Sequence, residues 1–474
     1  MDAISTVPLP KNEPVYTYAP GTKERAEIEA ALAAAYNQGP IELTGSYGAQ
    51  RRPGSGHEIQ VTMPSEHSHV LGVLHQSTAS DTQQAIEAAL AVAPEWANTS
   101  IDDRAAIFLR AAELITGPYR AKINAATMLG QGKTVQQAEI DSACELADFL
   151  RFNAAYARQL YAEQPQSSPT VWNRLDYRPL DGFVYAITPF NFTAIAGNLP
   201  SSPALMGNVC IWKPSTTQQF AAQVFVDILE EAGLPAGVIN CLPGHGREIS
   251  DVALAHESLA GIHFTGSTRT FQSIWAEIGT NISRYRAYPR LVGETGGKDF
   301  VLAHPSADPQ ALVVALVRGS FEYTGQKCSA ASRTYIAKSV WDKIKDQLIA
   351  ETEAIKVGDV RDLSCLTSAL IDERAYDKLV AAIEKARSEA EILAGGTYDR
   401  SVGWYVRPTL AKSDDPGNDI FTTEFFGPLL GIYVYDDHRY GEVIKMIDTS
   451  AKYALTGSVI ANDRQAIDQA AIGL

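Results

Sequence analysis

The sequence has little of what marks a secreted, metal-stapled or membrane protein. Its five cysteines are widely spaced and form no CxxC pair, which argues against a disulfide framework and a structural zinc site and favours a reducing compartment. The longest apolar runs fall well short of a membrane span, and the N-terminal MDAISTVPLPKNEP has no apolar core of signal-peptide length. We therefore expect a soluble, cytoplasmic protein that does not enter a membrane.

An excess of basic residues is missing as well. The chain of 474 residues has 55 Asp and Glu against 40 Lys and Arg, for a net charge of -15. This balance argues against a nucleic-acid surface and favours a small diffusing substrate. The length is enough for two to three domains.

A strict G-x-G-x-x-G motif is also absent. The nearest match, LPGHGREIS, has Gly244 and Gly246 but no third glycine, so this motif alone leaves a dinucleotide site open. In FTGS, Gly266 stands where a predicted strand leads into a helix, whose start offers N–H groups and a positive dipole end to a phosphate. An ordinary strand-to-helix turn explains Gly266 equally well.

The first part of the chain is predicted to be mainly helical. The patterns indicate a helix over Lys23 to Asn37 and further helices from Ser80 to Glu163, with Asp81 and Asp102 placed where N-caps are expected. Residues 164–182 then mix Pro, Ser and aromatic residues in short extended pieces. Such an exposed hairpin is either a loop or a segment that pairs with another subunit.

From Phe183 onward, strand and helix patterns alternate at the spacing of βαβ units on a parallel sheet. Ligands collect at the carboxyl ends of such strands. Three predicted strands end in polar turns, at residues 188–191, 213–215 and 265–267. A second α/β unit follows, with its boundary near residue 290.

The loop FEYTGQKCSAASR contains the candidate nucleophile, Cys328. A thiolate attacking a carbonyl later needs a base to activate water, and Glu294, in a glycine-rich turn, has the right chemistry. The plainer interpretations are a small buried cysteine and a surface turn residue. Asn191, in TPFNFT, is suited to stabilise an oxyanion together with the Cys328 N–H, or to cap a helix.

Two further charged residues occupy positions that favour cofactor binding. Lys213, in IWKPS, ends a buried strand, where its ammonium either donates to ribose hydroxyls or extends to solvent. Glu424, in EFFGP, either holds a ribose or caps the Gly-Pro turn.

The motifs TPFNFT, IWKPS, FTGS, GETGGKD, GQKCSA and EFFGP occur together in an order that closely resembles the aldehyde dehydrogenase superfamily. Within it, GQGKTVQQAEID, FEYTGQKCSAASR and YALTGSVI are similar to the Δ1-pyrroline-5-carboxylate dehydrogenases, also called glutamate-γ-semialdehyde dehydrogenases. The likeness runs from about residue 8 to the end.

The resemblance implies an α/β fold of the aldehyde dehydrogenase type, with a Rossmann-type cofactor domain, an α/β catalytic domain and a β-hairpin excursion for oligomerisation. The NAD-binding domain is expected over residues 1–163 and 182–290, with 460–474 returning to it. Residues 291–459 are expected to form the catalytic domain, and 164–181 the hairpin of a homodimer or higher homo-oligomer.

The resemblance also implies roles for individual positions. Cys328 is expected to be the nucleophile, Glu294 the base that activates water, and Asn191 an oxyanion donor. The expected cofactor-binding residues are Thr188, Lys213, Gly266, Ser267, Thr268, Arg269, Thr270 and Glu424. The expected substrate contacts are Phe192, Ser329, Lys327 and Glu145, and no metal is expected.

The implied reaction is NAD-dependent oxidation of L-glutamate γ-semialdehyde to L-glutamate through a cysteine thioester, in proline catabolism. Transfer of the acyl group to coenzyme A is an alternative against which Glu294 argues. Family members continue past Leu474 into a tail that binds the substrate carboxylate, so a truncated chain is expected here. A non-catalytic NAD-binding fragment is therefore a second alternative.

Overall fold

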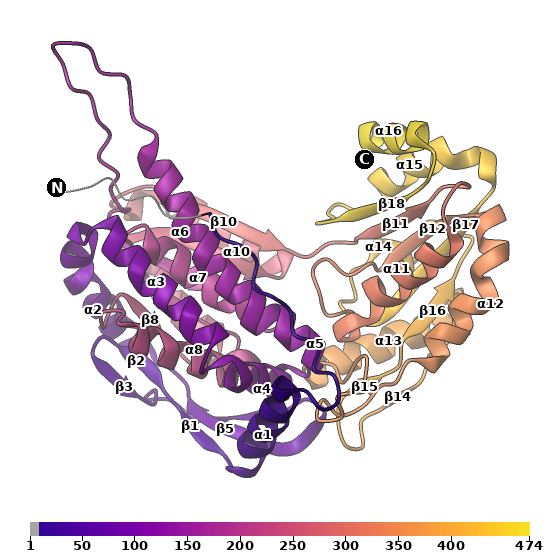
Figure 1. Ribbon diagram of the computed structural model, residues 1–474, viewed down its shortest axis with the longest axis horizontal. Helices are drawn as coiled ribbons and strands as arrows, with labels where there is room; N and C mark the ends of the chain where they lie inside the picture. The colour runs from indigo at the N-terminus through magenta and orange to yellow at the C-terminus, as the bar shows by residue number, and fades with distance from the viewer. Residues whose placement is uncertain (1–8) are drawn as a thin grey trace. The chain divides into compact units, whose positions relative to one another are not determined.

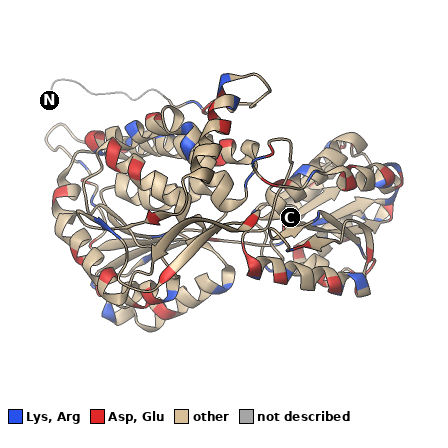
Figure 2. Ribbon diagram, turned by 90° about the horizontal axis from the view of Figure 1, so that it is seen from below, with Lys and Arg blue, Asp and Glu red and all other residues tan. Residues whose placement is uncertain are grey.

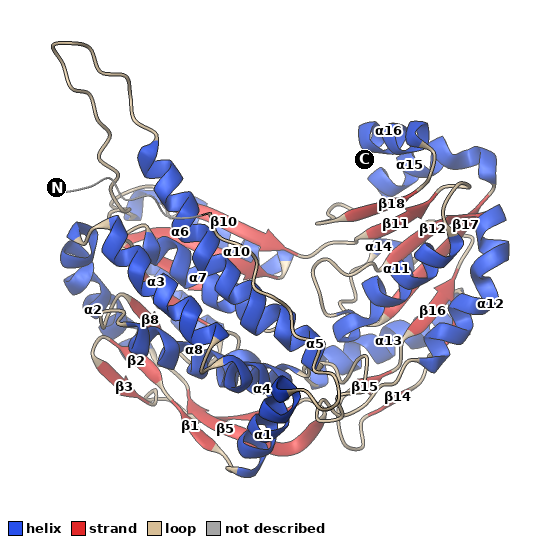
Figure 3. Ribbon diagram, in the orientation of Figure 1, coloured by secondary structure: helices blue, strands red, loops and turns tan. Residues whose placement is uncertain are grey.

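The computed structural model describes residues 9–474, which form two compact units. Unit 1 contains the described residues up to Thr62 together with His69–Gln131 and Ala138–Glu294. Unit 2 contains Met63–Ser68, Gly132–Gln137 and Thr295–Leu474. Both units combine helices with a largely parallel sheet, so the α/β class predicted from the sequence is confirmed (Figure 3).

A five-stranded sheet of order β10-β9-β6-β7-β8 lies at the centre of unit 1. β6 pairs in parallel with both β7 and β9, and β7 pairs in parallel with β8. β6, β7, β8 and β9 are largely buried and mainly apolar, whereas the edge strand β10 has no buried residue. The strands are β6 (Phe183–Ile187), β7 (Val209–Lys213), β8 (Ile239–Cys241), β9 (Leu259–Gly266) and β10 (Arg290–Thr295).

Helices cover this sheet. α3, α6, α7 and α8 lie side by side over it in Figure 1, and α2, α9 and α10 pack against β7 and β9. The helices of this part of the chain are α1 (Lys23–Asn37), α2 (Ala79–Asn98), α3 (Ile101–Thr116), α4 (Arg120–Gln131), α5 (Val135–Ala138), the π-helix Glu139–Glu145, α6 (Leu146–Ala162), α7 (Thr193–Leu205), α8 (Gln219–Ala232), α9 (Gly246–Ala255) and α10 (Thr268–Thr280).

Short strands precede the helical region. β4 and β5 are neighbours in a three-stranded sheet with β1, and β2 pairs with β3. The strands are β1 (Ile41–Leu43), β2 (Gly45–Tyr47), β3 (Gln50–Arg52), β4 (Glu58–Met63) and β5 (Glu66–His75).

The helix Lys23–Asn37 begins and ends at the predicted residues. The prediction of Asp81 and Asp102 as N-caps is wrong, because α2 is capped by Thr78 and α3 by Ser100. Asp81 instead stands three residues into α2 and completes a capping box with Thr78. In both helices, a residue with a hydroxyl group a few positions earlier is therefore the N-cap.

Residues 164–181 leave the globular part of unit 1, and Figure 1 shows them as a long loop after α6. A single antiparallel bridge joins Ser168 and Val171, with N···O distances of 3.0 and 3.2 Å. Its apolar side chains lie in solvent, and Trp172 is 78% exposed. The segment is thus an extended excursion with one bridged turn.

A six-stranded sheet of order β13-β16-β17-β12-β11-β18 forms the centre of unit 2. β13 pairs antiparallel with β16, and the remaining neighbours pair in parallel. The strands are β11 (Phe300–Ala303), β12 (Arg333–Ala337), β13 (Glu391–Ala394), β16 (Thr409–Lys412), β17 (Leu429–Tyr435) and β18 (Gly457–Ile460), with the separate pair β14 (Tyr398–Asp399) and β15 (Tyr405–Val406).

The helices of unit 2 bury the two faces of this sheet in one apolar cluster. They are α11 (Pro309–Phe321), α12 (Lys338–Ala354), α13 (Glu373–Glu389), α14 (Asp419–Thr422), α15 (Tyr440–Ser450) and α16 (Arg464–Gly473). α16 packs against α15 inside unit 2. The expected return of residues 460–474 to the first domain is therefore not what the structure shows.

Lys and Arg are scattered among Asp and Glu over the helices (Figure 2). Within the described residues, no helix is long and apolar enough to cross a membrane. The same residues contain no group of three or more His, Cys, Asp or Glu side chains placed to hold a metal ion.

Candidate active site

Three of the predicted functional segments follow β6, β7 and β9, which are parallel neighbours in the unit 1 sheet. Parallel pairing brings their carboxyl ends to one edge, so Thr188, Lys213 and Gly266 lie along that edge. The Thr188 N–H donates to the Lys213 carbonyl at 3.1 Å, and Trp212 Nε1 donates to Thr188 Oγ1 at 3.0 Å. The Thr188 hydroxyl is thereby oriented by a buried indole.

A cavity of about 540 Å³ opens beside this edge, within unit 1. Its lining includes Lys213, Gly246, Arg247, Ser250 and Thr270. Two cationic groups and several hydroxyls are donors suited to the phosphates and ribose hydroxyls of a dinucleotide. Burial lowers the pKa of Lys213 to about 8.

A cofactor phosphate could also use the start of α10, although part of that start is already satisfied. Ser267 is the N-cap and accepts from the Thr270 N–H at 3.2 Å. A Cβ on Gly266 would stand 2.8 Å from the Phe264 ring, so packing alone requires glycine there. Of the predicted residues 266–270, only Thr270 lines the cavity.

Asn191 is buried in the turn between β6 and α7. The N-cap of α7 is Phe192, which has no side-chain oxygen and makes no capping hydrogen bond. The structure therefore excludes the plainer interpretation of Asn191 as the N-cap. The α7 amides of Thr193 and Ala194 instead donate to the Asp141 carboxylate, at 3.0 and 2.8 Å.

The two candidate acids of unit 1 are both half-buried. Glu294 is the penultimate residue of β10 and precedes Gly296 and Gly297. Glu145 is the last residue of the π-helix Glu139–Glu145. Each carboxylate therefore keeps some contact with solvent, as a group that activates water or contacts a polar substrate requires.

Cys328 follows a backbone segment of unusual conformation in unit 2. Tyr323, Thr324 and Gly325 are consecutive left-handed residues, with φ of 50°, 55° and 64°. Such values are costly for Tyr and Thr and persist only where neighbouring contacts impose them. Thr324 is held by Thr367, whose hydroxyl accepts from the Thr324 N–H at 2.7 Å.

A glycine is required at the end of this segment. A Cβ on Gly325 would stand 2.5 Å from the carbonyl oxygen of Gly427, in the EFFGP turn. The side chain of Gln326 then accepts from the Ile371 N–H at 2.9 Å. These contacts hold the loop while Cys328 itself stays half-exposed.

The side chains next to Cys328 differ in their surroundings. The Lys327 ammonium lies 3.3 Å from Glu322 Oε2, which also accepts from Gln137 at 3.0 Å. Ser329 is exposed. An ion pair therefore already engages Lys327, which weakens its prediction as a substrate contact.

Glu424 lies in unit 2, where its carboxylate accepts from the Gly297 N–H at 3.1 Å. Burial raises the pKa of Glu424. Lys298 is 2% exposed, and its Nζ has no hydrogen-bond partner among the described residues. Burial, reinforced by Arg333, lowers the pKa of Lys298 to about 7.

Three functional candidates were missed from the sequence. Arg247 follows Gly246 in LPGHGREIS and lines the cavity. The glycine spacing of this motif carries no information about a basic residue next to it. Lys298 stands in GETGGKD. Its burial depends on contacts between distant segments, which the sequence of this turn does not reveal. Asp141 gave no local signal, because it serves a helix that begins 52 residues later.

The chain was compared with known proteins. The family model described as "Aldehyde dehydrogenase family" matches residues 51–474. A protein from Agaricus bisporus named delta-1-pyrroline-5-carboxylate dehydrogenase is 45% identical over 464 residues, covering 97% of this chain and 85% of the relative. The mitochondrial protein of that name from Homo sapiens is 45% identical, covering 97% of this chain and 82% of its own length.

Solved structures give the same result. The Delta-pyrroline-5-carboxylate dehydrogenase from Mycobacterium tuberculosis bound with NAD has a TM-score of 0.97 and 56% identity, and covers 100% of this chain and 88% of that one. The 1-pyrroline-5-carboxylate dehydrogenase from Thermus with bound NAD has a TM-score of 0.92 and 26% identity, and covers 98% of this chain and 89% of that one.

Proposed function

The chain belongs to the aldehyde dehydrogenase family, and we propose from this premise that it oxidises L-glutamate γ-semialdehyde to L-glutamate with NAD, in proline catabolism. The semialdehyde is the open form of 1-pyrroline-5-carboxylate. The observation that carries the proposal is the 56% identity, over the whole chain, to an NAD-bound dehydrogenase named for that substrate.

The residues of unit 1 fit the cofactor. Lys213 and Arg247 supply positive charge in the cavity, and Ser250 and Thr270 supply hydroxyls. NAD accepts a hydride from the substrate carbon when bound. We propose that Lys213 donates to the ribose and that Thr188 and residues 266–270 border the cofactor. In unit 2, the Glu424 carboxylate is proposed to receive ribose hydroxyls.

We propose that Cys328 attacks the aldehyde carbon and forms a thiohemiacetal. The amide of Asn191 and the Cys328 N–H stabilise its oxyanion. After oxidation to the thioester, Glu294 takes a proton from water, whose oxygen attacks the thioester carbonyl. The Cys328 thiolate leaves, glutamate is released, and the thiol is ready for another turnover.

The substrate contacts of the chain are proposed more broadly. Phe192 is suited to the aliphatic part of the substrate, and Glu145 and Ser329 to its polar groups. Lys327 takes part only if its ion pair with Glu322 is exchanged for one with substrate. The presence of Glu294 favours hydrolysis over transfer to coenzyme A.

Assembly and compartment are also part of the proposal. The excursion 164–181 exposes Val171, Trp172 and Leu175 at 53%, 78% and 52%, which favours burial against another copy in a homodimer or higher oligomer. The five free thiols fit a reducing compartment such as the cytoplasm. Several relatives, the human one among them, are named as mitochondrial proteins.

The test follows NADH formation from the semialdehyde with native chain and with Cys328→Ala. We expect native turnover and a loss of at least about a thousandfold in the variant, because the nucleophile is removed. Cys365→Ala, a buried cysteine of the same unit, is the matched control and should retain activity. No turnover by the native chain, or full activity in Cys328→Ala, would contradict the proposal.

Product analysis separates the second candidate. Glutamate formed without coenzyme A supports hydrolysis, and Glu294→Gln should then accumulate the thioester on Cys328. A product that appears only with coenzyme A would favour the acyl-transfer reaction.

A further inference from the structure

Helix α7, which follows Asn191 in the chain, begins without a cap of its own. The first amides of a helix have no partner within the helix and are usually served by Ser, Thr, Asp or Asn at the N-cap. Phe192 occupies that position here. The helix is 13 residues long and its start is buried, so its amides need another acceptor.

That acceptor is Asp141. Its two carboxylate oxygens accept from the N–H groups of Thr193 and Ala194, at 3.0 and 2.8 Å. Asp141 is completely buried, and a negative charge at this point also interacts favourably with the helix dipole. The side chain of Thr193 is fixed as well, by Thr127 at 2.8 Å and Gln131 at 2.7 Å.

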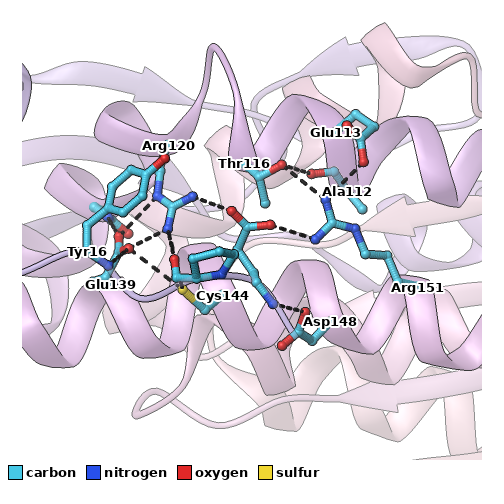
Figure 4. A network of polar contacts seen from close by, with 12 residues as sticks. Tyr16, Ala112, Glu113, Thr116, Arg120, Glu139, Cys144, Asp148 and Arg151 are labelled. Carbon is cyan, nitrogen blue, oxygen red and sulfur yellow. Dashed lines mark hydrogen bonds and ion pairs between the residues drawn. The ribbon is translucent and has the colours of Figure 1, made fainter. Parts of the chain in front are cut away.

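Asp141 stands in the first turn of the π-helix Glu139–Glu145, and Glu139, two residues earlier in the same turn, is anchored separately. Glu139 accepts from the Tyr16 N–H at 2.9 Å, from the Tyr18 hydroxyl at 2.7 Å and from Asn124 at 2.8 Å. Figure 4 shows Arg120 beside Glu139, and the same guanidinium donates to Glu13 and to the Pro14 carbonyl in the N-terminal arm, residues 9–22. The carboxylate that serves α7 is thus part of a braced segment.

This arrangement takes the helix cap from a different element than the turn that carries Asn191 and Phe192. A carboxylate from another element satisfies the amides, so Asn191 and Phe192 do not have to fold back onto the helix start. Both are residues to which the proposed function gives a role at the substrate. Capping by Asp141 therefore fixes the backbone at the start of the helix, directly after these two residues.

We propose that Asp141 is a positioning residue for the reaction: by holding the Thr193 and Ala194 amides, it sets the place of Asn191 as oxyanion donor. The proposal rests on the role given to Asn191 in the proposed function. Asp141 itself touches neither substrate nor cofactor in this proposal. Its effect on rate passes through Asn191.

The first variant is Asp141→Asn, which keeps the shape but loses the charge and turns an NH2 group toward one of the amides. We expect kcat/KM for the semialdehyde to fall about 10- to 100-fold, while NAD affinity stays within about twofold. Asp141→Glu keeps the charge and moves the oxygens by one methylene. It is expected to fold and to lose activity similarly, so the test does not depend on the stability of Asp141→Asn alone.

Asp81→Asn is the matched control. Asp81 is also a buried carboxylate of unit 1 that accepts from two backbone amides: that of Thr78, the N-cap of α2, at 2.9 Å, and that of the loop residue Ser55 at 2.8 Å. It should lower the melting temperature but leave kcat/KM within about twofold. An equal loss of activity in Asp81→Asn would reduce Asp141 to a general stabilising residue and overturn the proposal.

A double-mutant cycle with Asn191→Ala isolates the positioning effect. If Asp141 acts through Asn191, Asp141→Asn should lower the rate by less than about threefold once Asn191 is gone. The full 10- to 100-fold loss in that background would overturn the proposal, since a merely structural defect would persist there.

A second substrate separates this proposal from the proposed function. With p-nitrophenyl acetate, the Cys328 thiolate takes the acetyl group, p-nitrophenolate leaves, and water releases acetate. This reaction needs the oxyanion donor but neither NAD nor the semialdehyde. If the native chain cleaves the ester but does not oxidise the semialdehyde, the substrate assignment fails. The double-mutant cycle is then measured with the ester, and its result decides whether Asp141 acts through Asn191. If it cleaves neither, both proposals fail.

Discussion

The start of α7 in unit 1 and the cysteine loop in unit 2 are both held in fixed conformations, but by different forces. At α7 the support is a buried charge, the Asp141 carboxylate, on a π-helix anchored by a second one, Glu139. In the loop it is neutral: hydroxyls of Thr324 and Thr367, and a glycine against the Gly427 carbonyl. The stability of the α7 start should therefore fall when a charge is removed, and that of the cysteine loop when side-chain volume is added.

Gly325→Ala is expected to have the largest effect. The new Cβ would stand 2.5 Å from the Gly427 oxygen, at a φ of 64° that alanine disfavours. We expect a loss of about 3 kcal/mol in unfolding free energy and of about 100-fold in kcat, because backbone strain and the clash add. Denaturant unfolding and NADH formation measure the two quantities.

Gly233→Ala is its control. Gly233 ends α8 with a φ of 95°, yet no atom lies within 4 Å of its added Cβ. It should cost about 1 kcal/mol, from backbone strain alone, and leave kcat unchanged. Equal effects of the two substitutions would show that the loop does not depend on close packing.

Glu139→Gln tests the charged support. It removes the buried partner of Arg120 while Glu13 remains in contact with that guanidinium. Burial alone would raise the pKa of Glu139, but the hydrogen bond from Arg120 holds this pKa below its usual range. We expect a loss of about 3 kcal/mol, since a buried ion pair is broken on one side only.

The exposed pair Arg25 and Glu29, at 2.8 Å, provides the comparison. Glu29→Gln should cost less than about 0.5 kcal/mol in the same denaturant experiment. If Glu139→Gln lost equally little unfolding free energy, the ion pair of Glu139 with Arg120 would not be what stabilises the π-helix.

Lys298→Met addresses a buried charge without a hydrogen-bond partner in unit 2. A lysine whose pKa is lowered to about 7 in the folded chain binds fewer protons there than in the unfolded chain between pH 7 and 10.5. Stability from this group therefore rises with pH in that window, and its cost is greatest below pH 7.

The variant should accordingly be more stable than the native chain at pH 6. Its advantage should shrink by about 2 to 3 kcal/mol by pH 9, because the folded lysine is then neutral while the unfolded lysine still holds its proton. Unfolding at the two pH values measures this difference. An advantage that is independent of pH would mean that Lys298 stays protonated in the folded chain.

Local patterns predicted much of the fold, and contacts between distant segments account for what they missed. The helix Lys23–Asn37 follows from its own residues. The left-handed Tyr323 and Thr324 do not, because their residue types disfavour positive φ and only the contacts with Thr367 and Ser368 impose it.

The candidate site divides in the same way. Lys213 was predicted from a strand end and Thr270 from the family resemblance, and both line the cavity. Gly266 was predicted for a phosphate, yet its packing against Phe264 already accounts for the glycine. Asp141 could not be predicted, because it caps a helix far along the chain and no local sequence pattern connects it with that helix. Cys328, Glu294 and Asn191 remain predictions as catalytic residues.

The distribution of the thiols has a practical consequence. Cys144, Cys210, Cys241 and Cys365 are buried, and burial raises the pKa of each, whereas Cys328 is half-exposed. A native chain should therefore consume one equivalent of an alkylating reagent quickly and four more only after unfolding. The fast equivalent counts accessible Cys328 thiols in a preparation, and its slowing by a ligand reports occupancy at that cysteine.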